Sequence, residues 1–373
     1  MNGSCFKNGQ LLRSPLISIL FIVAMVLLAT LIFCLLALQD SQGIGNGKLK
    51  LIIDNDGGAD DAMAIFMALL NEKYYNGPEV IALTSVNGNV RENQTFINIQ
   101  KILNAVDRRD VNIYRGASHA LLNNSVVSDF YFGRDGLGDL EPVSFNQIKD
   151  QNEIAANALI DYSKEYQDNL VVFSLGALTN IALAVRLDPE FIGRLGHLYI
   201  AAGYIYDEKY AEQEFNIQMD VEAYKIVTDE ALADRVTIIP FSTVMECLNI
   251  TNDWRINTLG AIPTPLVRLQ NQWERISLQT TPYWSLLDPS AISVLLDPCV
   301  VTEKRCSHNS VVLNGSARGI TTNDFDDVEK YNVNIITKMD EDVYKNLLYK
   351  LFSAELNVGP RRSKPTYLSD NQN

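Results

Sequence analysis

Four aspartates within eight residues follow one short apolar run and precede another. They are Asp54, Asp56, Asp60 and Asp61, in the segment LIIDNDGGADD that spans residues 51–61. Carboxylates this close repel one another strongly unless a cation neutralises them, and oxygen ligands at this density suit Ca²⁺ or Mg²⁺. A helix N-cap with acids in its first turn is the alternative, and it accounts for Asp60 and Asp61 only. The segment therefore predicts a site for a hard divalent cation.

The aspartate segment resembles the Asp-x-Asp-x-x-x-Asp-Asp signature of the calcium-dependent, inosine–uridine-preferring nucleoside hydrolases. Further motifs follow in the order in which that family has them. They are the Gly-Asn turn at 88–89, the Phe-Gly-Arg-Asp-Gly-Leu-Gly loop at 132–138, the Leu-Gly-Ala-Leu-Thr-Asn stretch at 175–180, the Glu-Phe-Asn segment at 214–216 and the Leu-Asp-Pro segment at 287–289. The similarity extends from about residue 51 to residue 298, so it implies the fold and the chemistry of that family.

The resemblance implies a cation-dependent hydrolysis of an N-glycosidic bond. Such a bond breaks through an oxocarbenium-like ribosyl cation, so an enzyme must supply a water molecule, stabilise the sugar and help the base to leave. Matched position by position, Asp56, Asp61 and Asp288 are expected to bind Ca²⁺ together with the backbone carbonyl of Thr179. Asp56 is also expected to take the proton from the attacking water as general base.

Ribose hydroxyls are the expected partners of a second group of polar residues. The matching positions are Asp60, Asn89, Glu214 and Asn216, and Asp288 shares this task. Asp54 corresponds to the first aspartate of the family signature, and it is expected to orient the neighbouring ligands. Each of these residues alone would suit a surface turn, so the joint pattern is what favours a ribose site.

Two positions depart from the family pattern where a leaving base would be protonated. Members that accept both base types carry a histidine just before the closing aspartate, and this chain has Leu287 there. The histidine that many members place before the first glycine of the 132–138 loop is Phe132 in this chain. Leucine cannot donate a proton, so activation of the leaving base comes from another group, or the activity is weak.

Aromatic stacking offers a way to release a purine without a placed acid. In the purine-specific branch of the family, aromatic rings sandwich the base and favour protonation of its N7 by solvent. Phe132, Trp284 and Tyr283 are the candidates in this chain, since stacking contributes about 1–3 kcal/mol per base. The sequence thus favours purine nucleosides. A catalytically weak or silent homologue that binds Ca²⁺ or nucleosides is the alternative, favoured by the missing histidine and opposed by the otherwise complete ribose site.

Strands and helices are expected to alternate from residue 48 onwards. Strands are expected at 49–53, 80–85, 111–114, 170–174, 197–201 and 236–239. Helices are expected at 61–70, 95–105, 153–165, 178–187 and 221–229. This alternation predicts a single large α/β domain with a doubly wound, mostly parallel sheet. Ligands bind beyond the carboxyl ends of the strands in such sheets, which is where the aspartate segment lies.

An uncharged apolar segment near the N-terminus predicts a transmembrane signal anchor. Its 24 residues extend about 36 Å as a helix, enough to cross a hydrocarbon core of about 30 Å. Lys7 and Arg13 precede the segment and favour a cytoplasmic N-terminus. A cleaved signal peptide is the alternative, although its apolar region is usually shorter. The expected order is a cytoplasmic tail at 1–14, the membrane segment at 15–38, a linker at 39–47 and an extracellular or lumenal domain at 48–373.

Acidic residues outnumber basic residues by 45 to 31, for a formal net charge of −14. A surface this acidic repels phosphate backbones, so no binding to nucleic acid is expected. Sequons compatible with glycosylation begin at Asn93, Asn123, Asn249 and Asn314.

The cysteines beyond the membrane segment are Cys247, Cys299 and Cys306. Cys299 and Cys306 are close enough in sequence to form a small disulfide loop that leaves Cys247 odd, and buried free thiols are the alternative. The family resemblance also implies a homodimer or homotetramer.

Overall fold

The computed structural model describes residues 48–122, 128–141 and 144–357. All of them belong to the second of two compact units, Gly45–Asn373. The tail at 1–14, the predicted membrane segment at 15–38 and the linker at 39–47 lie outside the described residues. Within the described ranges, no helix combines the length and the apolar character needed to cross a bilayer.

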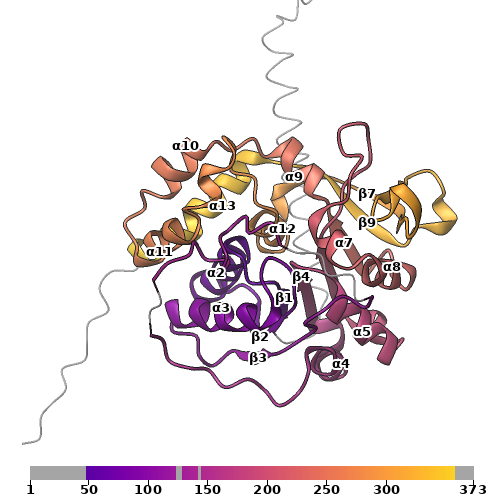
Figure 1. Ribbon diagram of the computed structural model, residues 1–373, viewed down its shortest axis with the longest axis horizontal. Coiled ribbons are helices and arrows are strands. Elements are labelled where there is room, and N and C mark those ends of the chain that lie inside the picture. Colours follow the sequence, from indigo (N-terminus) through magenta and orange to yellow (C-terminus); the bar gives the residue numbers. More distant parts are fainter. Residues whose placement is uncertain (1–47, 123–127, 142–143, 358–373) are drawn as a thin grey trace, which may run out of the picture. The chain divides into compact units, whose positions relative to one another are not determined.

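A nine-stranded sheet runs through this unit in the order β3-β2-β1-β4-β5-β6-β9-β7-β8 (Figure 1). Neighbours from β3 to β9 pair in parallel, whereas β7 pairs antiparallel with both β9 and β8. The strands are β1 (Lys50–Asn55), β2 (Glu79–Ser85), β3 (Asn112–Tyr114), β4 (Leu170–Ser174), β5 (His197–Ala201), β6 (Val236–Ile239), β7 (Val301–Val311), β8 (Thr321–Asp324) and β9 (Val333–Met339). The predicted mostly parallel, doubly wound sheet is confirmed, and the antiparallel edge is an unexpected addition to it.

Helices connect the strands and cover both faces of the sheet. The longer ones are α2 (Ala59–Tyr75), α3 (Glu92–Ala105), α4 (Ala155–Tyr166), α5 (Thr179–Leu187), α8 (Val221–Asp229), α11 (Pro265–Trp273), α12 (Leu287–Leu296) and α13 (Glu341–Phe352). The shorter ones are α6 (Phe191–Arg194), α7 (Phe215–Met219), α9 (Phe241–Cys247), α10 (Asn252–Trp254) and α14 (Ala354–Asn357). A π-helical turn, Arg255–Leu259, continues α10.

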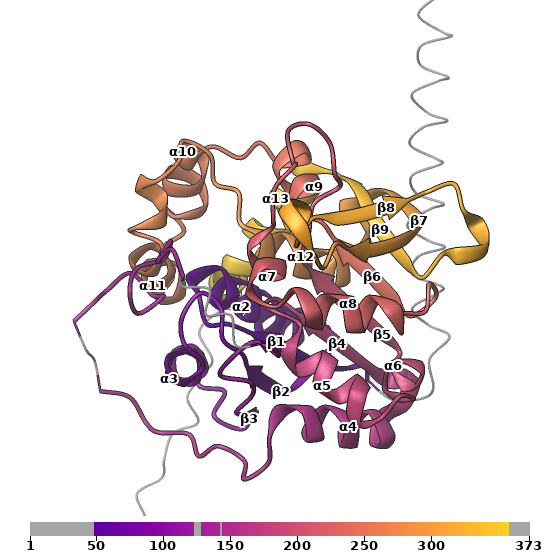
Figure 2. The ribbon, with the colours of Figure 1, turned by 45° about the vertical axis from the view of Figure 1, so that its right-hand side comes forward.

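Apolar side chains bury the sheet on both sides. Leu51 and Ile53 of β1 lie in one core cluster with α2 and α12, whereas Ile52 lies in a second cluster with α4, α5 and α8. Successive side chains of a strand point to opposite faces, so this division identifies a sheet covered on both faces. Figure 2 shows α4, α5 and α8 along one face of the strands, and α5 packs against both of its neighbours.

Of the two alternatives left open for Cys299 and Cys306, the disulfide loop between them is ruled out, because Cys306 is an exposed free thiol. Cys306 is in the middle of β7, whose first residue is Val301. Five extended residues span about 16 Å, whereas the Cα atoms of a disulfide lie within about 7 Å of each other. Cys247, at the end of α9, is also a free thiol.

Candidate active site

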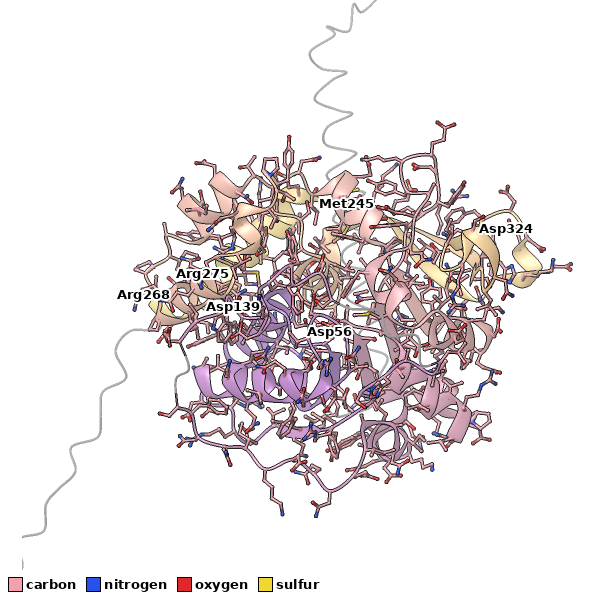
Figure 3. The ribbon with its side chains drawn as sticks, viewed as in Figure 1. Asp56, Asp139, Met245, Arg268, Arg275 and Asp324 are labelled. Atoms are coloured by element: carbon pink, nitrogen blue, oxygen red, sulfur yellow. The ribbon has the colours of Figure 1, made fainter. Side chains whose placement is uncertain are left out.

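The aspartate segment lies where the strand order reverses. β1 sits between β2 and β4, and the chain builds the sheet outwards in both directions from this point. Ligands of doubly wound sheets bind beyond the carboxyl ends of the strands at such a switch point. β1 ends at Asn55, and Figure 3 shows the next residue, Asp56, in the middle of the unit. The topology therefore puts this segment where a ligand is expected.

Three buried carboxylates form the cluster best suited to a cation. One oxygen from each of Asp60, Asp61 and Asp288 lies within 4.8 Å of the others. Asp60 and Asp61 are in the first turn of α2, Asp288 is in the first turn of α12, and these two helices pack against each other. Oδ2 of Asp288 is buried without a hydrogen-bond partner. A buried orphan oxygen among three carboxylates fits a hard cation, which takes oxygen ligands.

Asp56 lies directly beside this cluster. Its carboxylate accepts bonds from the side-chain amide and the backbone N–H of Asn89, both at 2.9 Å. Its own N–H donates to Oδ1 of Asp61 at 3.1 Å. A Cβ atom on Gly88 would lie 1.8 Å from Oδ2 of Asp56, so only glycine permits this close approach. The fold thus brings together two of the candidate site residues, Asn89 and Asp56.

The cluster differs from the predicted ligand set in one member. Asp61 and Asp288 belong to both sets, but the third carboxylate within 4.8 Å of them is that of Asp60 instead of Asp56. Thr179 begins α5, and its hydroxyl donates to Asp220 at 2.8 Å. A Cβ atom on Gly176, in the turn before α5, would lie 3.1 Å from Cβ of Asp56, so this turn borders the site. The ligand role of the Thr179 carbonyl stays a prediction.

Asp54 connects the site to the neighbouring strands. Its Oδ1 accepts bonds from the Thr84 hydroxyl at 2.5 Å and from the Asn180 amide at 2.7 Å. The same amide donates to the carbonyl of Ser85 at 2.9 Å. These contacts hold the end of β1 to β2 and to α5, which suits a residue that orients its neighbours. Asn180 belongs to a motif seen in the sequence, but its bridging position depends on the fold.

Glu214 and Asn216 organise the ends of β4 and β5. The Glu214 carboxylate caps α7 and also accepts the N–H of Gly203 at 2.9 Å. The Asn216 amide donates to the carbonyls of Leu175 and Ala201, at 2.8 and 2.9 Å. Both side chains are buried beside the strand ends, and their contacts with ribose stay a prediction.

Phe132 and Trp284 are core residues in this structure. Each is only 4% exposed. The Trp284 indole N–H donates to Glu274 at 2.7 Å, and the Arg255 guanidinium lies 5.7 Å from the ring centroid. The Phe132 ring meets Tyr131 edge-on at 4.8 Å. Stacking of a base on either ring therefore stays a prediction, whereas Tyr283 is 53% exposed.

Sequence reasoning missed two residues near the cluster. Glu274 is completely buried, and its negative charge contributes to raising the pKa of Asp60, after burial and Asp56. The pKa of Tyr131 is raised by burial first, and the charges of Asp60 and Glu274 add to the effect. Neither residue belongs to a motif, so the sequence carries no signal for them.

Comparison with known proteins identifies the family. Residues 51–346 match the family model described as inosine-uridine preferring nucleoside hydrolase. The chain belongs to this family of N-ribosyl hydrolases. The predicted family is therefore confirmed, and the match spans every site residue discussed above.

Relatives within the family differ in the bases that their names state. The chain is 37% identical over 194 residues to probable uridine nucleosidase 2 of Arabidopsis thaliana, covering 50% of this chain and 57% of that protein. It is 27% identical over 282 residues to the inosine-uridine preferring nucleoside hydrolase of Leishmania major, covering 74% and 88% of the two chains. The solved purine-preferring ribonucleoside hydrolase of Gardnerella vaginalis superimposes with a TM-score of 0.73 at 27% identity, covering 82% and 99%. The chain thus spans little more than half the length of the Arabidopsis relative.

Burial and mutual repulsion hold protons on the acids of this nucleoside hydrolase family member. Burial raises the pKa of Asp54 and of Asp61 to about 7 each. Burial also raises the pKa values of Asp56, Asp60 and Asp288, and the charges of neighbouring carboxylates raise them further. A bound cation reverses this effect because it favours the ionised carboxylates.

We expect the cation-free protein to lose unfolding free energy as the pH rises from about 4 to about 7. Over this interval the unfolded acids, with a pKa of 3.8, have released protons that the folded Asp54 and Asp61 retain. The unfolded state binds fewer protons, so the slope of stability against pH is negative. Burial lowers the pKa of His197 to about 4, which gives an opposite slope from one group only.

Urea unfolding in EDTA at several pH values measures this dependence. The Asp61→Asn variant should have a shallower slope than the parent, and saturating Ca²⁺ should make the slope of the parent positive. A parent protein whose stability rises steadily with pH in EDTA would contradict the raised pKa values.

Proposed function

We propose that this chain hydrolyses the N-glycosidic bond of ribonucleosides to a free base and ribose. The observation that carries the proposal is the buried cluster of Asp60, Asp61 and Asp288, with its unpartnered oxygen, beside Asp56 at the switch point of the sheet. Family membership supports the reaction class. We propose Ca²⁺ as the cation, because the donors are all oxygens.

The proposed site divides the work among its residues. Asp56, Asp61 and Asp288, with the Thr179 carbonyl, would hold the cation, and Asp60 lies in the same cluster. A bound Ca²⁺ would chelate the ribose diol and polarise the attacking water. Asp56 would take the proton of that water as general base, and a cation at this site would keep its carboxylate ionised for that role.

Ribose hydroxyls would be held by the polar groups around the cluster. We assign this contact to Asp60, Asn89, Glu214, Asn216 and Asp288. Asn89 is positioned by its two bonds to Asp56, and Asn216 by its two bonds to backbone carbonyls. Because these bonds fix the side chains before substrate arrives, little ordering is left for binding, which supports a preorganised ribose site.

We propose purine nucleosides as the preferred substrates. Leu287 is buried in the first turn of α12 and offers no proton to a leaving base. Relatives are named for uridine as well as for purines, so family membership leaves the base open. The exposed ring of Tyr283 and the ring of Phe132 are the proposed stacking partners.

Release of free base from inosine, adenosine, guanosine and uridine in the presence of Ca²⁺ tests the proposed function. The same assay in EDTA is the control. A protein that binds Ca²⁺ and releases no base from any of the four nucleosides would instead be a silent homologue, the reading that the absence of a histidine at Leu287 favours.

We further propose a single-pass membrane protein with a cytoplasmic N-terminus and an extracellular or lumenal catalytic domain. The asparagines of three sequons, Asn93, Asn249 and Asn314, are exposed in the folded domain, which supports modification there. Protein from a secretory host should lose mass on glycosidase treatment and need detergent for extraction. Changing each of these asparagines to glutamine should remove part of the mass shift. A soluble form that begins near residues 39–47 would show that the apolar segment is cleaved.

A further inference from the structure

A buried carboxylate next to the cation cluster has a complete set of hydrogen-bond donors. Glu274 is fully buried and pairs with the buried Arg255 through two bonds, at 3.1 and 2.9 Å. The amide of Gln270 donates to its Oε1 at 2.8 Å, and the indole of Trp284 donates to its Oε2 at 2.7 Å. Bonds to an ionised acceptor are short and strong, so these four side chains form a stiff unit.

Two hydrogen-bonded connections, which we call arms, lead from this unit to the two segments that carry the cluster. The Gln270 amide that bonds to Glu274 also donates to the carbonyl of Ala59 at 2.7 Å. Ala59 is the residue before Asp60 and begins α2, and α11 packs beside α2 in Figure 1. This arm connects Glu274 to the first turn of α2.

The second arm reaches the other side of the cluster. Trp284 stands four residues before Asp288 in the chain, and its indole donates to the Glu274 carboxylate. The Trp284 ring also stacks on Tyr344 of α13. The chain between Trp284 and Asp288 leads straight into the first turn of α12. A third arm, from Arg255 to the side chain of Asn271 at 2.7 Å, leads to neither segment.

We propose that Glu274 is a positioning residue that sets the separation between Asp60 and Asp61 on one side and Asp288 on the other. The proposal rests on the cation site proposed above. The Glu274 carboxylate is connected to each of the two segments through one side chain, Gln270 or Trp284, which acts as a bridge. The three cluster carboxylates are therefore held close together before a cation binds. Ligands that are already ordered lose less conformational free energy when they bind a cation. Loss of either bridge therefore weakens cation binding, even though neither Gln270 nor Trp284 touches the cation.

Variants that cut one arm each test this role. Glu274→Gln is unsuitable alone, because it leaves the Arg255 charge buried without a partner and destabilises the fold. Gln270→Met removes the bridge to Ala59 and keeps the ion pair, and Trp284→Phe removes the indole donor and keeps an aromatic ring. Asn271→Leu cuts the third arm and is the matched control.

Calorimetric titration of the full-length, cation-stripped chain with Ca²⁺ is the measurement, with urea unfolding in EDTA as the second readout. We expect Gln270→Met and Trp284→Phe to weaken Ca²⁺ binding about 10-fold or more, the range measured for residues that support metal ligands. Asn271→Leu should stay within about 3-fold of the parent, because the fold keeps both bridges.

The outcomes separate this proposal from the proposed function. Parent-like Ca²⁺ affinity in both bridge variants, with an equal loss of unfolding free energy in all three, would overturn the positioning role and leave the cation site intact. A parent protein that binds no Ca²⁺ would overturn the cation site and the role of Glu274 with it. If Trp284 stacks on the base instead, Trp284→Phe should raise KM for inosine without changing Ca²⁺ affinity, which would also overturn the second arm.

Discussion

Replacing Asp61 with alanine is expected to abolish both cation binding and base release. Asp61 contributes one of the three clustered carboxylates, and it also accepts the N–H groups of Asp56 and Gly58, at 3.1 and 2.7 Å. The variant therefore loses a ligand and the bonds that shape the loop. We expect Ca²⁺ affinity to fall by more than about 100-fold, since residues that only support ligands already cost 10- to 100-fold. The value of kcat/KM should fall by about 1,000-fold or more, because a cation contributes several kcal/mol to such a reaction.

Asp61→Asn and Asp340→Ala are the controls for this prediction. The asparagine keeps an acceptor for the loop but lacks the charge, so it should retain the fold and still bind Ca²⁺ poorly. Asp340 caps α13 by accepting the N–H of Val343 at 3.0 Å. Its loss should cost about 1 kcal/mol of unfolding free energy and leave Ca²⁺ affinity unchanged. Unchanged affinity in Asp61→Ala, measured by calorimetry, would refute the cation assignment.

The parallel part of the sheet could be predicted because its strands are buried on both faces. β4, β5 and β6 have the bounds expected from their apolar runs, and β1 and β2 differ by at most two residues at either end. A strand covered by helices on both sides carries little besides apolar residues, so it stands out from its flanks. The position of the aspartate segment at the end of β1 followed from the same run.

The antiparallel edge could not be predicted in this way. β7 has the sequence VTEKRCSHNSV, and exposed and buried positions are mixed along it. Its middle residues face solvent, so polar side chains interrupt any apolar pattern. The pairing of β7 with β8 and β9 then depends on contacts between distant segments, which local composition does not record.

The site was predictable where its residues are consecutive and obscure where they are not. Asp54, Asp56, Asp60 and Asp61 stand together in the chain, so their chemistry shows in the sequence. Asp288 could be assigned only through the family resemblance. Glu274 at the end of an amphipathic helix looks like a solvent-exposed acid, and only its burial against Arg255, 19 residues away, shows that it belongs beside the cluster.

Purine nucleosides are expected to be turned over far faster than pyrimidine nucleosides. Uracil has no ring nitrogen equivalent to purine N7 that solvent can readily protonate, so its departure depends on a placed acid or on stabilisation of its anion. Leu287 supplies neither, and it is buried at the start of α12. We expect kcat/KM for inosine or guanosine to exceed that for uridine by about 100-fold or more, since a general acid contributes 10²- to 10⁴-fold.

Restoring a proton donor should narrow this difference. Leu287→His places an imidazole directly before Asp288, so uridine turnover should rise while inosine turnover changes little. Leu287→Met keeps an apolar side chain of similar volume and should leave the ratio of the two substrates unchanged. Base release followed for both substrates over a range of pH also tells how the gain arises, because a histidine acid should act only below its own pKa. Comparable turnover of uridine and inosine by the parent protein would show that another group already protonates the base. Tyr131 would then be the first residue to replace with phenylalanine, because after burial the charge of Asp60 raises its pKa and so identifies it as a hydroxyl near the cluster.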